Sequence, residues 1–122
     1  MRQVPIGDFT MHLAEAGSGP PLVLVHGFPL DHSMWQGQME GLSSQFHVIA
    51  PDLRGFGQSK SADEVVTMAQ FADDIAAMLD ALEITEPIVY CGLSMGGYIG
   101  WQFIQRHCDR VAKLIQCDTK AK

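Results

Sequence analysis

One short segment combines a nucleophilic side chain with the small neighbours that such a nucleophile needs. Ser94 stands within Gly92-Leu93-Ser94-Met95-Gly96, where the apolar run 88–92 ends and a segment of helical character begins. A serine at a sharp strand-to-helix turn adopts a strained backbone, and this strain lifts its hydroxyl clear of the sheet. The spacing therefore predicts that Ser94 is a nucleophile.

Two backbone amides are expected to stabilise the negative charge that such an attack creates. The turn places the Met95 N–H beneath an oxyanion formed at Ser94. A second loop, His26-Gly27-Phe28-Pro29, follows the apolar run 22–25, and Gly27 frees its backbone to turn the Phe28 N–H toward Ser94. We expect His26 to support this loop through backbone hydrogen bonds. Four residues are expected to assist without reacting: His26, Gly27, Gly92 and Gly96.

The apolar residues that follow the second loop are candidates for a substrate pocket. Leu30, Met34 and Trp35 would line it, together with the side chains of Phe28 and Met95.

A third loop, 51–59, follows another apolar run and carries two charged residues, Asp52 and Arg54. We expect these two to form a structural ion pair and to brace the floor of the site.

The elements that must position these loops can be inferred from hydrophobic periodicity. Near-continuous apolar runs indicate strands buried on both faces, and such strands alternating with amphipathic helices indicate βαβ units. A capping box at Thr67 and Gln70 marks the start of the clearest helix. We predict one domain, 1–122, of the α/β class: a three-layer, mainly parallel sheet with flanking helices. The expected strands are 3–6, 10–15, 22–27, 46–52, 88–92 and 110–117, and the expected helices are 33–42, 67–82 and 95–106.

The three loops, in this order and spacing, resemble the α/β-hydrolase fold family over essentially the whole chain. The most similar branch comprises carboxylesterases, lactonases and perhydrolase-like enzymes that use no metal or organic cofactor. The resemblance implies ester hydrolysis through an acyl-enzyme on Ser94, with no cofactor. Dehalogenases and epoxide hydrolases share the His-Gly-x-Pro loop, but they carry an aspartate where this chain has Ser94.

The resemblance also implies an acid and a histidine that follow the serine in the chain. This chain ends after what corresponds to the sixth strand, so it resembles the N-terminal half of a family member. His32 in the second loop and Asp118 after the last strand are the internal candidates for the missing base and acid. Slow hydrolysis is therefore expected. The alternatives are a non-catalytic module for binding or dimerisation, and the N-terminal part of a longer hydrolase.

Composition narrows the range of partners. A net charge of -6 argues against nucleic acid and anionic membranes as partners. The partner that the resemblance implies is a small ester-type substrate. The N-terminal residues show no signal peptide, and no apolar run is long enough to span a bilayer. Three scattered cysteines are expected to be reduced in a cytoplasmic protein. The apolar last strand, 110–117, is expected to pair with a second copy in a homodimer.

Overall fold

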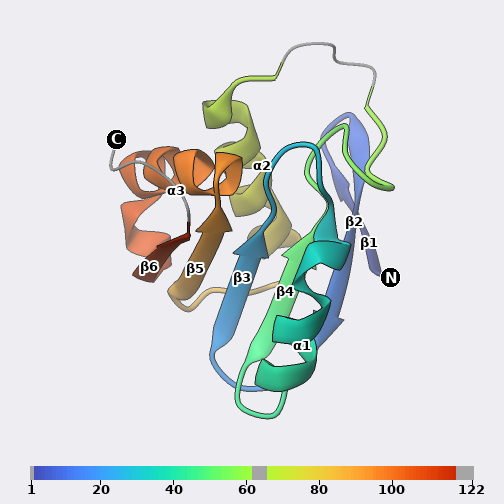
Figure 1. Ribbon diagram of the computed structural model, residues 1–122. Coiled ribbons are helices and arrows are strands. Elements are labelled where there is room, and N and C mark those ends of the chain that lie inside the picture. Colours follow the sequence, from blue (N-terminus) through green and yellow to red (C-terminus); the bar gives the residue numbers. More distant parts are fainter. Residues whose placement is uncertain (1, 62–65, 118–122) are drawn as a thin grey trace.

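The computed structural model describes residues 2–61 and 66–117. Its centre is a six-stranded sheet in the order β1-β2-β4-β3-β5-β6 (Figure 1). The strands are β1 (Arg2–Ile6), β2 (Phe9–Ala16), β3 (Pro21–Val25), β4 (His47–Pro51), β5 (Ile88–Leu93) and β6 (Val111–Cys117). The helices are α1 (Gln36–Leu42), α2 (Met68–Ala81) and α3 (Met95–Arg106), with the 3₁₀ turns η1 (His32–Trp35) and η2 (Cys108–Arg110).

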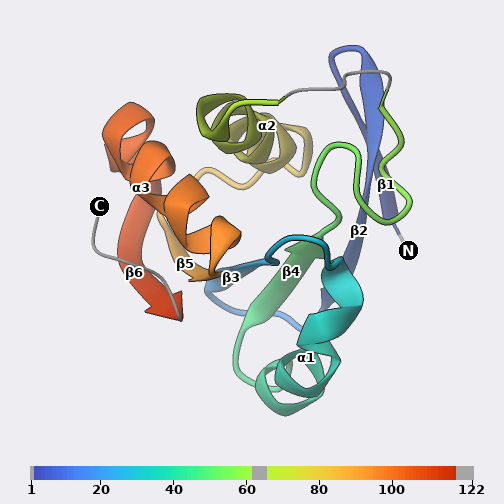
Figure 2. The ribbon, with the colours of Figure 1, turned by 45° about the horizontal axis from the view of Figure 1, so that its top comes forward.

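Four strands form the parallel part of the sheet. Strand β3 pairs in parallel with β4 and β5, and β5 pairs in parallel with β6. The hairpin of β1 and β2 adds an antiparallel edge next to β4. Helices α2 and α3 cover one face and α1 the other, as Figure 2 shows. The predicted three-layer, mainly parallel α/β fold is confirmed.

The two faces of the sheet bury two separate apolar cores. The larger core lies between the sheet and helices α2 and α3, and it includes Ile75, Tyr90 and Phe103. The smaller one lies under η1 and α1, where Trp35 packs with Leu24 and Val48. Because the β3, β4 and β5 side chains that point to either face are apolar, these strands read as continuous apolar runs in the sequence.

Two local predictions are corrected by the structure. The helix expected at 33–42 is divided into η1 and α1, since the Asp31 carboxylate accepts from the Ser33 N–H and caps a tight first turn. The capping box before α2 is only half formed. Thr67 Oγ1 accepts from the Gln70 N–H at 3.0 Å, but the Gln70 side chain donates to Asp74 instead of turning back to the cap.

Within the described residues, no helix combines the length and apolar character needed to cross a membrane.

Candidate active site

Ser94 occupies a strained turn between β5 and α3. Its φ of 52° and ψ of -109° place it in a region that residues with a side chain rarely adopt. A Cβ at Gly92 would lie 2.4 Å from the Gly96 carbonyl oxygen, and one at Gly96 would lie 2.3 Å from the Val25 carbonyl oxygen. Glycine is therefore required at both positions, and the predicted strand-turn-helix geometry is confirmed.

Hydrogen bonds hold this turn from three sides. The Ser94 carbonyl accepts from the N–H groups of Gly97 and Tyr98, at 2.9 and 3.2 Å. The Ser94 N–H donates to the Cys117 carbonyl at the end of β6, at 2.9 Å. Beneath the turn, the buried Tyr90 hydroxyl donates to the Gly96 carbonyl at 2.7 Å. The backbone of the turn is thus fixed to both β6 and β5.

The loop after β3 passes directly against the turn. A Cβ at Gly27 would lie 3.5 Å from the Ser94 Cβ and 3.0 Å from the Leu93 carbonyl oxygen. A side chain at Gly27 would therefore press on the Leu93 carbonyl, which precedes the nucleophile, and would contact the Ser94 side chain. On the other side, Met95 is the first residue of α3, so its N–H has no acceptor within the helix. Met95 follows Ser94 in the chain, and Phe28 follows Gly27, whose backbone lies against the Ser94 side chain.

His26 supports the loop as expected. Its ring is fully buried, Nε2 accepts from the Leu53 N–H at 3.0 Å, and Nδ1 lies 3.0 Å from the Gly27 carbonyl oxygen. These contacts assign the proton to Nδ1, because Nε2 faces a donor and Nδ1 faces an acceptor. Burial lowers the pKa of His26 below its ordinary value of 6.5, so the ring is neutral at neutral pH.

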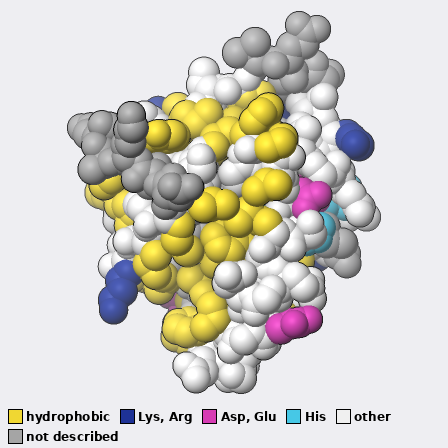
Figure 3. Space-filling view, in the orientation of Figure 1, with side chains coloured by type: hydrophobic (Ala, Val, Ile, Leu, Met, Phe, Trp, Pro, Cys, Tyr) yellow, Lys and Arg dark blue, Asp and Glu magenta, His cyan; other side chains and the backbone are white. Residues whose placement is uncertain are grey.

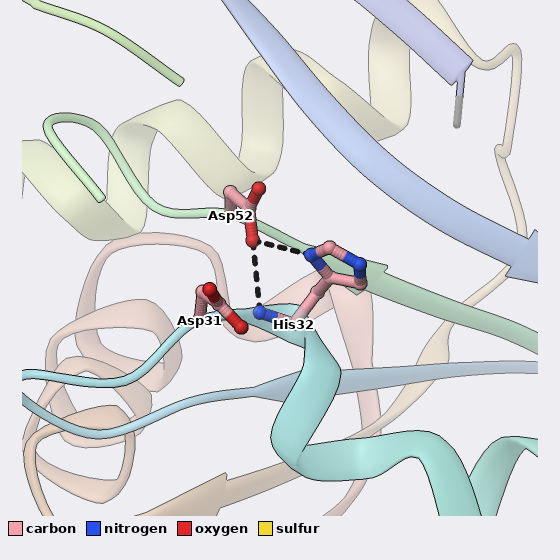
Figure 4. Close-up of side chains that lie close together, drawn as sticks. All are labelled: Asp31, His32 and Asp52. Carbon is pink, nitrogen blue, oxygen red and sulfur yellow. Dashed lines mark hydrogen bonds and ion pairs between the residues drawn. The ribbon is translucent and has the colours of Figure 1, made fainter. Parts of the chain in front are cut away.

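Asp52 joins two loops, and it binds His32 instead of the predicted partner, Arg54. Its buried carboxylate accepts from the His32 N–H at 2.8 Å and lies 2.7 Å from His32 Nδ1 (Figure 4). Its second oxygen accepts from the Gln58 N–H at 3.0 Å. The expected ion pair with Arg54 is wrong, because Arg54 turns away toward helix α2 and the β1–β2 turn.

Arg54 joins the loop after β4 to α2. Its Nε and one terminal nitrogen donate to the two oxygens of Asp74 at 2.8 and 2.9 Å, in a bidentate pair that is almost fully buried. A further nitrogen donates to Asp8 in the β1–β2 turn at 2.9 Å. These hydrogen bonds fix the loop after β4, which forms the floor of the site. The sequence suggested the same role for this loop.

One cluster in this region has the donor atoms of a metal site. Asp31, His32 and Asp52 offer ligand atoms within 4.8 Å of one another. The contacts within the cluster already use these atoms, since Asp52 holds His32 and Asp31 binds the N–H and hydroxyl of Ser33. The cluster therefore serves to join the loops after β3 and β4.

An open cavity of about 280 Å³ lies beside the turn. Two predicted pocket residues, Phe28 and Met95, line it, whereas Leu30, Met34 and Trp35 do not. Trp35 is instead buried in the core under η1, with Met34 packed against that core, and Leu30 is 43% exposed. The other lining residues are Arg54, Gly55, Phe56, Val66, Met68 and Phe71.

Sequence reasoning missed the aromatic side of this cavity. The Phe56 ring meets the rings of His26 and Phe28 edge-on, at centroid distances of 5.4 and 5.8 Å, and lies 6.3 Å from the Phe71 ring. The available signal was a bulky aromatic residue between the glycines of a loop, Gly55 and Gly57, where a polar residue is usual. Tyr90 was also missed, because a tyrosine within an apolar strand reads as an ordinary core residue.

The structure places the two candidates for base and acid differently. His32 directs its ring nitrogen Nδ1 to Asp52 and makes no hydrogen bond with Ser94. Asp118 lies outside the described residues.

Comparison with known proteins agrees with this geometry. Residues 20–121 match the family model described as alpha/beta hydrolase fold. An esterase from Thermogutta terrifontis superimposes with a TM-score of 0.96 at 45% identity, over 100% of this chain and 47% of the esterase. Among curated relatives, the soluble epoxide hydrolase of Corynebacterium sp. is 34% identical over 95% of this chain and 40% of its own length. An AB hydrolase superfamily protein of Bacillus subtilis is 37% identical over 80% of this chain and 37% of its own length.

The chain thus spans less than half the length of each of these proteins. The match nevertheless includes the turn at Ser94, the loop at Gly27 and the loop at Asp52, which together form the site described above. The chain belongs to the alpha/beta hydrolase fold family.

Proposed function

We propose that the chain carries the nucleophile and the oxyanion-binding amides of a serine hydrolase that cleaves carboxylic esters. The observation that carries this proposal is the backbone of Ser94, held at φ 52° at the start of α3 with the Gly27 backbone against its side chain. In this arrangement Ser94 would attack the ester carbonyl, and the N–H groups of Phe28 and Met95 would stabilise the oxyanion. His26, Gly27, Gly92 and Gly96 would hold these groups in place.

The hydroxyl nucleophile favours esters over epoxides, although an epoxide hydrolase is among the relatives. Attack of Ser94 on an ester gives an acyl-enzyme that is itself an ester, so water can release the enzyme. Attack on an epoxide would give an ether, which water does not cleave under these conditions. A serine at this position therefore supports acyl transfer.

The cavity beside Ser94 suggests a small apolar group on the substrate. Its volume of about 280 Å³ lies near the lower end of the usual range for ligand pockets, roughly 300–1,000 Å³. Phe28, Phe56, Phe71 and Met95 give it apolar walls. The charge of Arg54, which also borders the cavity, is compensated by Asp74 and Asp8. We infer that this cavity receives an uncharged acyl or alcohol group.

None of the described histidines makes a hydrogen bond with Ser94. Four of the rings contact other residues, and Nδ1 of the fifth, His12, is buried without a hydrogen-bond partner. The four are His26, His32, His47 and His107. We propose that the base comes from further chain, as the greater length of the relatives permits, or from a second copy. Oxyanion binding and substrate binding alone retain about 10³–10⁴-fold acceleration over water in comparable enzymes, so the chain by itself should be slow.

The test is hydrolysis of p-nitrophenyl acetate by the chain, by Ser94→Ala and by Ser44→Ala, which alters an exposed serine after α1. We expect slow turnover that is lost in Ser94→Ala and kept in Ser44→Ala. A fluorophosphonate probe should label the chain at Ser94. Equal near-background rates in all three proteins, without labelling, would favour the non-catalytic module.

We further propose that the free chain forms a homodimer through β6. This strand lies at the edge of the described sheet, and its Ile115 is 46% exposed. Figure 3 shows apolar side chains gathered on the face of the sheet that also carries α1.

The three cysteines are unpaired, which is consistent with the reducing cytoplasm.

A further inference from the structure

Two of the cysteines lie on neighbouring parallel strands, next to the turn at Ser94. Cys91 of β5 is paired with Ile115 of β6, and Leu93 is paired with Cys117. Because side chains alternate along a strand, Cys91 and Cys117 lie on the same face of the sheet as diagonal neighbours. Both thiols are partly accessible and unpaired.

The two thiols are close enough to influence each other. Burial, the charge of the adjoining Cys117 thiol and a side-chain hydrogen bond with Cys117 together raise the pKa of Cys91 to about 12. Cys91 is consequently protonated at neutral pH and is a weak nucleophile.

We propose that Cys91 and Cys117 form a modification site, a thiol pair that low-molecular-weight disulfides convert into a reversible cross-strand disulfide. This site is independent of the function proposed for Ser94. It also differs from Cys108, which is exposed on η2 and has no cysteine neighbour among the described residues.

The reaction is a two-step thiol–disulfide exchange. The Cys117 thiolate attacks one sulfur of oxidised glutathione, forms a mixed disulfide and releases one glutathione thiolate, which takes up the proton lost by Cys117. Cys91 then loses its proton and attacks the Cys117 sulfur, which expels the second glutathione. The protein is oxidised by two electrons, and one molecule of oxidised glutathione becomes two of the reduced form.

The diagonal placement makes the bridge reversible. Disulfides usually join residues whose Cα atoms are about 4.4–6.8 Å apart, and diagonal neighbours across a sheet are roughly 7–8 Å apart. Closing the bridge therefore requires the end of β6 to move toward β5. A bridge strained in this way is reduced more readily than a relaxed structural disulfide.

That movement reaches the nucleophile through one hydrogen bond. The carbonyl of Cys117 accepts the Ser94 N–H at 2.9 Å, so displacement of Cys117 changes the environment of the Ser94 amide. Oxidation of the pair should therefore be detectable at Ser94 as well as at the sulfurs.

The experiment uses the whole chain with Cys108→Ser, which removes the exposed third thiol, under native conditions with oxidised glutathione. We expect the intact mass to fall by two hydrogen atoms and the free thiols to fall from two to none, both reversed by dithiothreitol. Peptide mapping should link the Cys91 and Cys117 peptides. In an ¹⁵N-labelled sample, the Ser94 amide signal should shift upon oxidation.

The matched control adds Cys91→Ser to the same background, with circular dichroism to verify the fold. This protein should stop at a glutathione adduct on Cys117, because no second thiol completes the exchange. The proposal is overturned if Cys108→Ser itself stops at a glutathione adduct, forms disulfide-linked dimers, or keeps both thiols free while remaining folded.

Discussion

Close to Ser94, the addition of a single carbon atom to a neighbouring glycine would disrupt the turn that carries the nucleophile. The space that a Cβ at Gly92 would need is occupied by the backbone of Gly96 and Gly97, at 2.4–2.8 Å. Backbone atoms in the first turn of a packed helix cannot move aside as a flexible side chain can. The glycine pattern of the motif is therefore a steric requirement of the fold as well as a sign of chemistry.

We predict that Gly92→Ala lowers the free energy of unfolding by about 1–3 kcal/mol or more, the usual cost of an overpacked core. Any hydrolysis of p-nitrophenyl acetate should fall with it. Chemical denaturation with urea measures the first effect. The control is Gly37→Ala in α1, where a Cβ meets no atom within 4 Å, and there a gain of about 0.5–1 kcal/mol is expected. Equal stability of the two variants would contradict the packing described for the turn.

His26 makes the stability of the chain depend on pH. Its pKa is lowered chiefly by burial, so between its folded value and 6.5 the unfolded chain binds a proton that the folded chain does not. Stability from this group is complete above about pH 6.5 and is lost as the pH falls toward the folded pKa.

Urea denaturation at pH 7, 6 and 5 should therefore show a decrease in unfolding free energy that is steeper in the wild type than in His26→Gln. The amide of glutamine offers a donor and an acceptor in place of the two ring nitrogens, but it does not titrate. Parallel pH profiles of the two proteins would show that His26 does not bind its proton differently in the folded and unfolded states.

At the scale of elements, buried and exposed ion pairs differ in how much they contribute to the stability of the fold. The pair of Arg54 with Asp74 joins the loop after β4 to α2 and is buried, whereas Asp80 of the pair with Arg110 is 71% exposed. Removing one member of a buried pair leaves a charge without compensation, and this typically costs about 3–5 kcal/mol. An exposed pair contributes about 0–1 kcal/mol.

We accordingly expect Asp74→Asn to destabilise the chain by about 3 kcal/mol, since Arg54 keeps its contact with Asp8. Asp80→Asn should change stability by less than about 1 kcal/mol. Thermal and urea denaturation of the two variants measure the difference. A loss in Asp74→Asn no larger than in Asp80→Asn would contradict the bracing role of Arg54.

At the scale of the whole molecule, the sheet edge at β6 determines the expected association. Light scattering coupled to size exclusion should give the mass of a dimer for the free chain. Ile115→Lys should reduce it to a monomer, because a charge on an edge strand opposes pairing. Tyr98→Lys replaces a comparably exposed apolar residue on α3 and should leave the dimer intact. A wild-type monomer at high concentration would rule out this dimer.

The sequence by itself determined the α/β class, most of the elements and the turn at Ser94, because each depends on local patterns. Apolar runs define the buried strands, and glycines two positions from Ser94 permit the turn. What each long polar side chain binds was decided only by the tertiary structure. Arg54 binds Asp74 across 20 residues of chain, and Asp52 binds His32 across the same separation, so sequence proximity wrongly paired Arg54 with Asp52. The cavity likewise gathers Phe28, Phe71 and Met95 from three distant segments, and only the packing of α2 and α3 on the sheet brings them together.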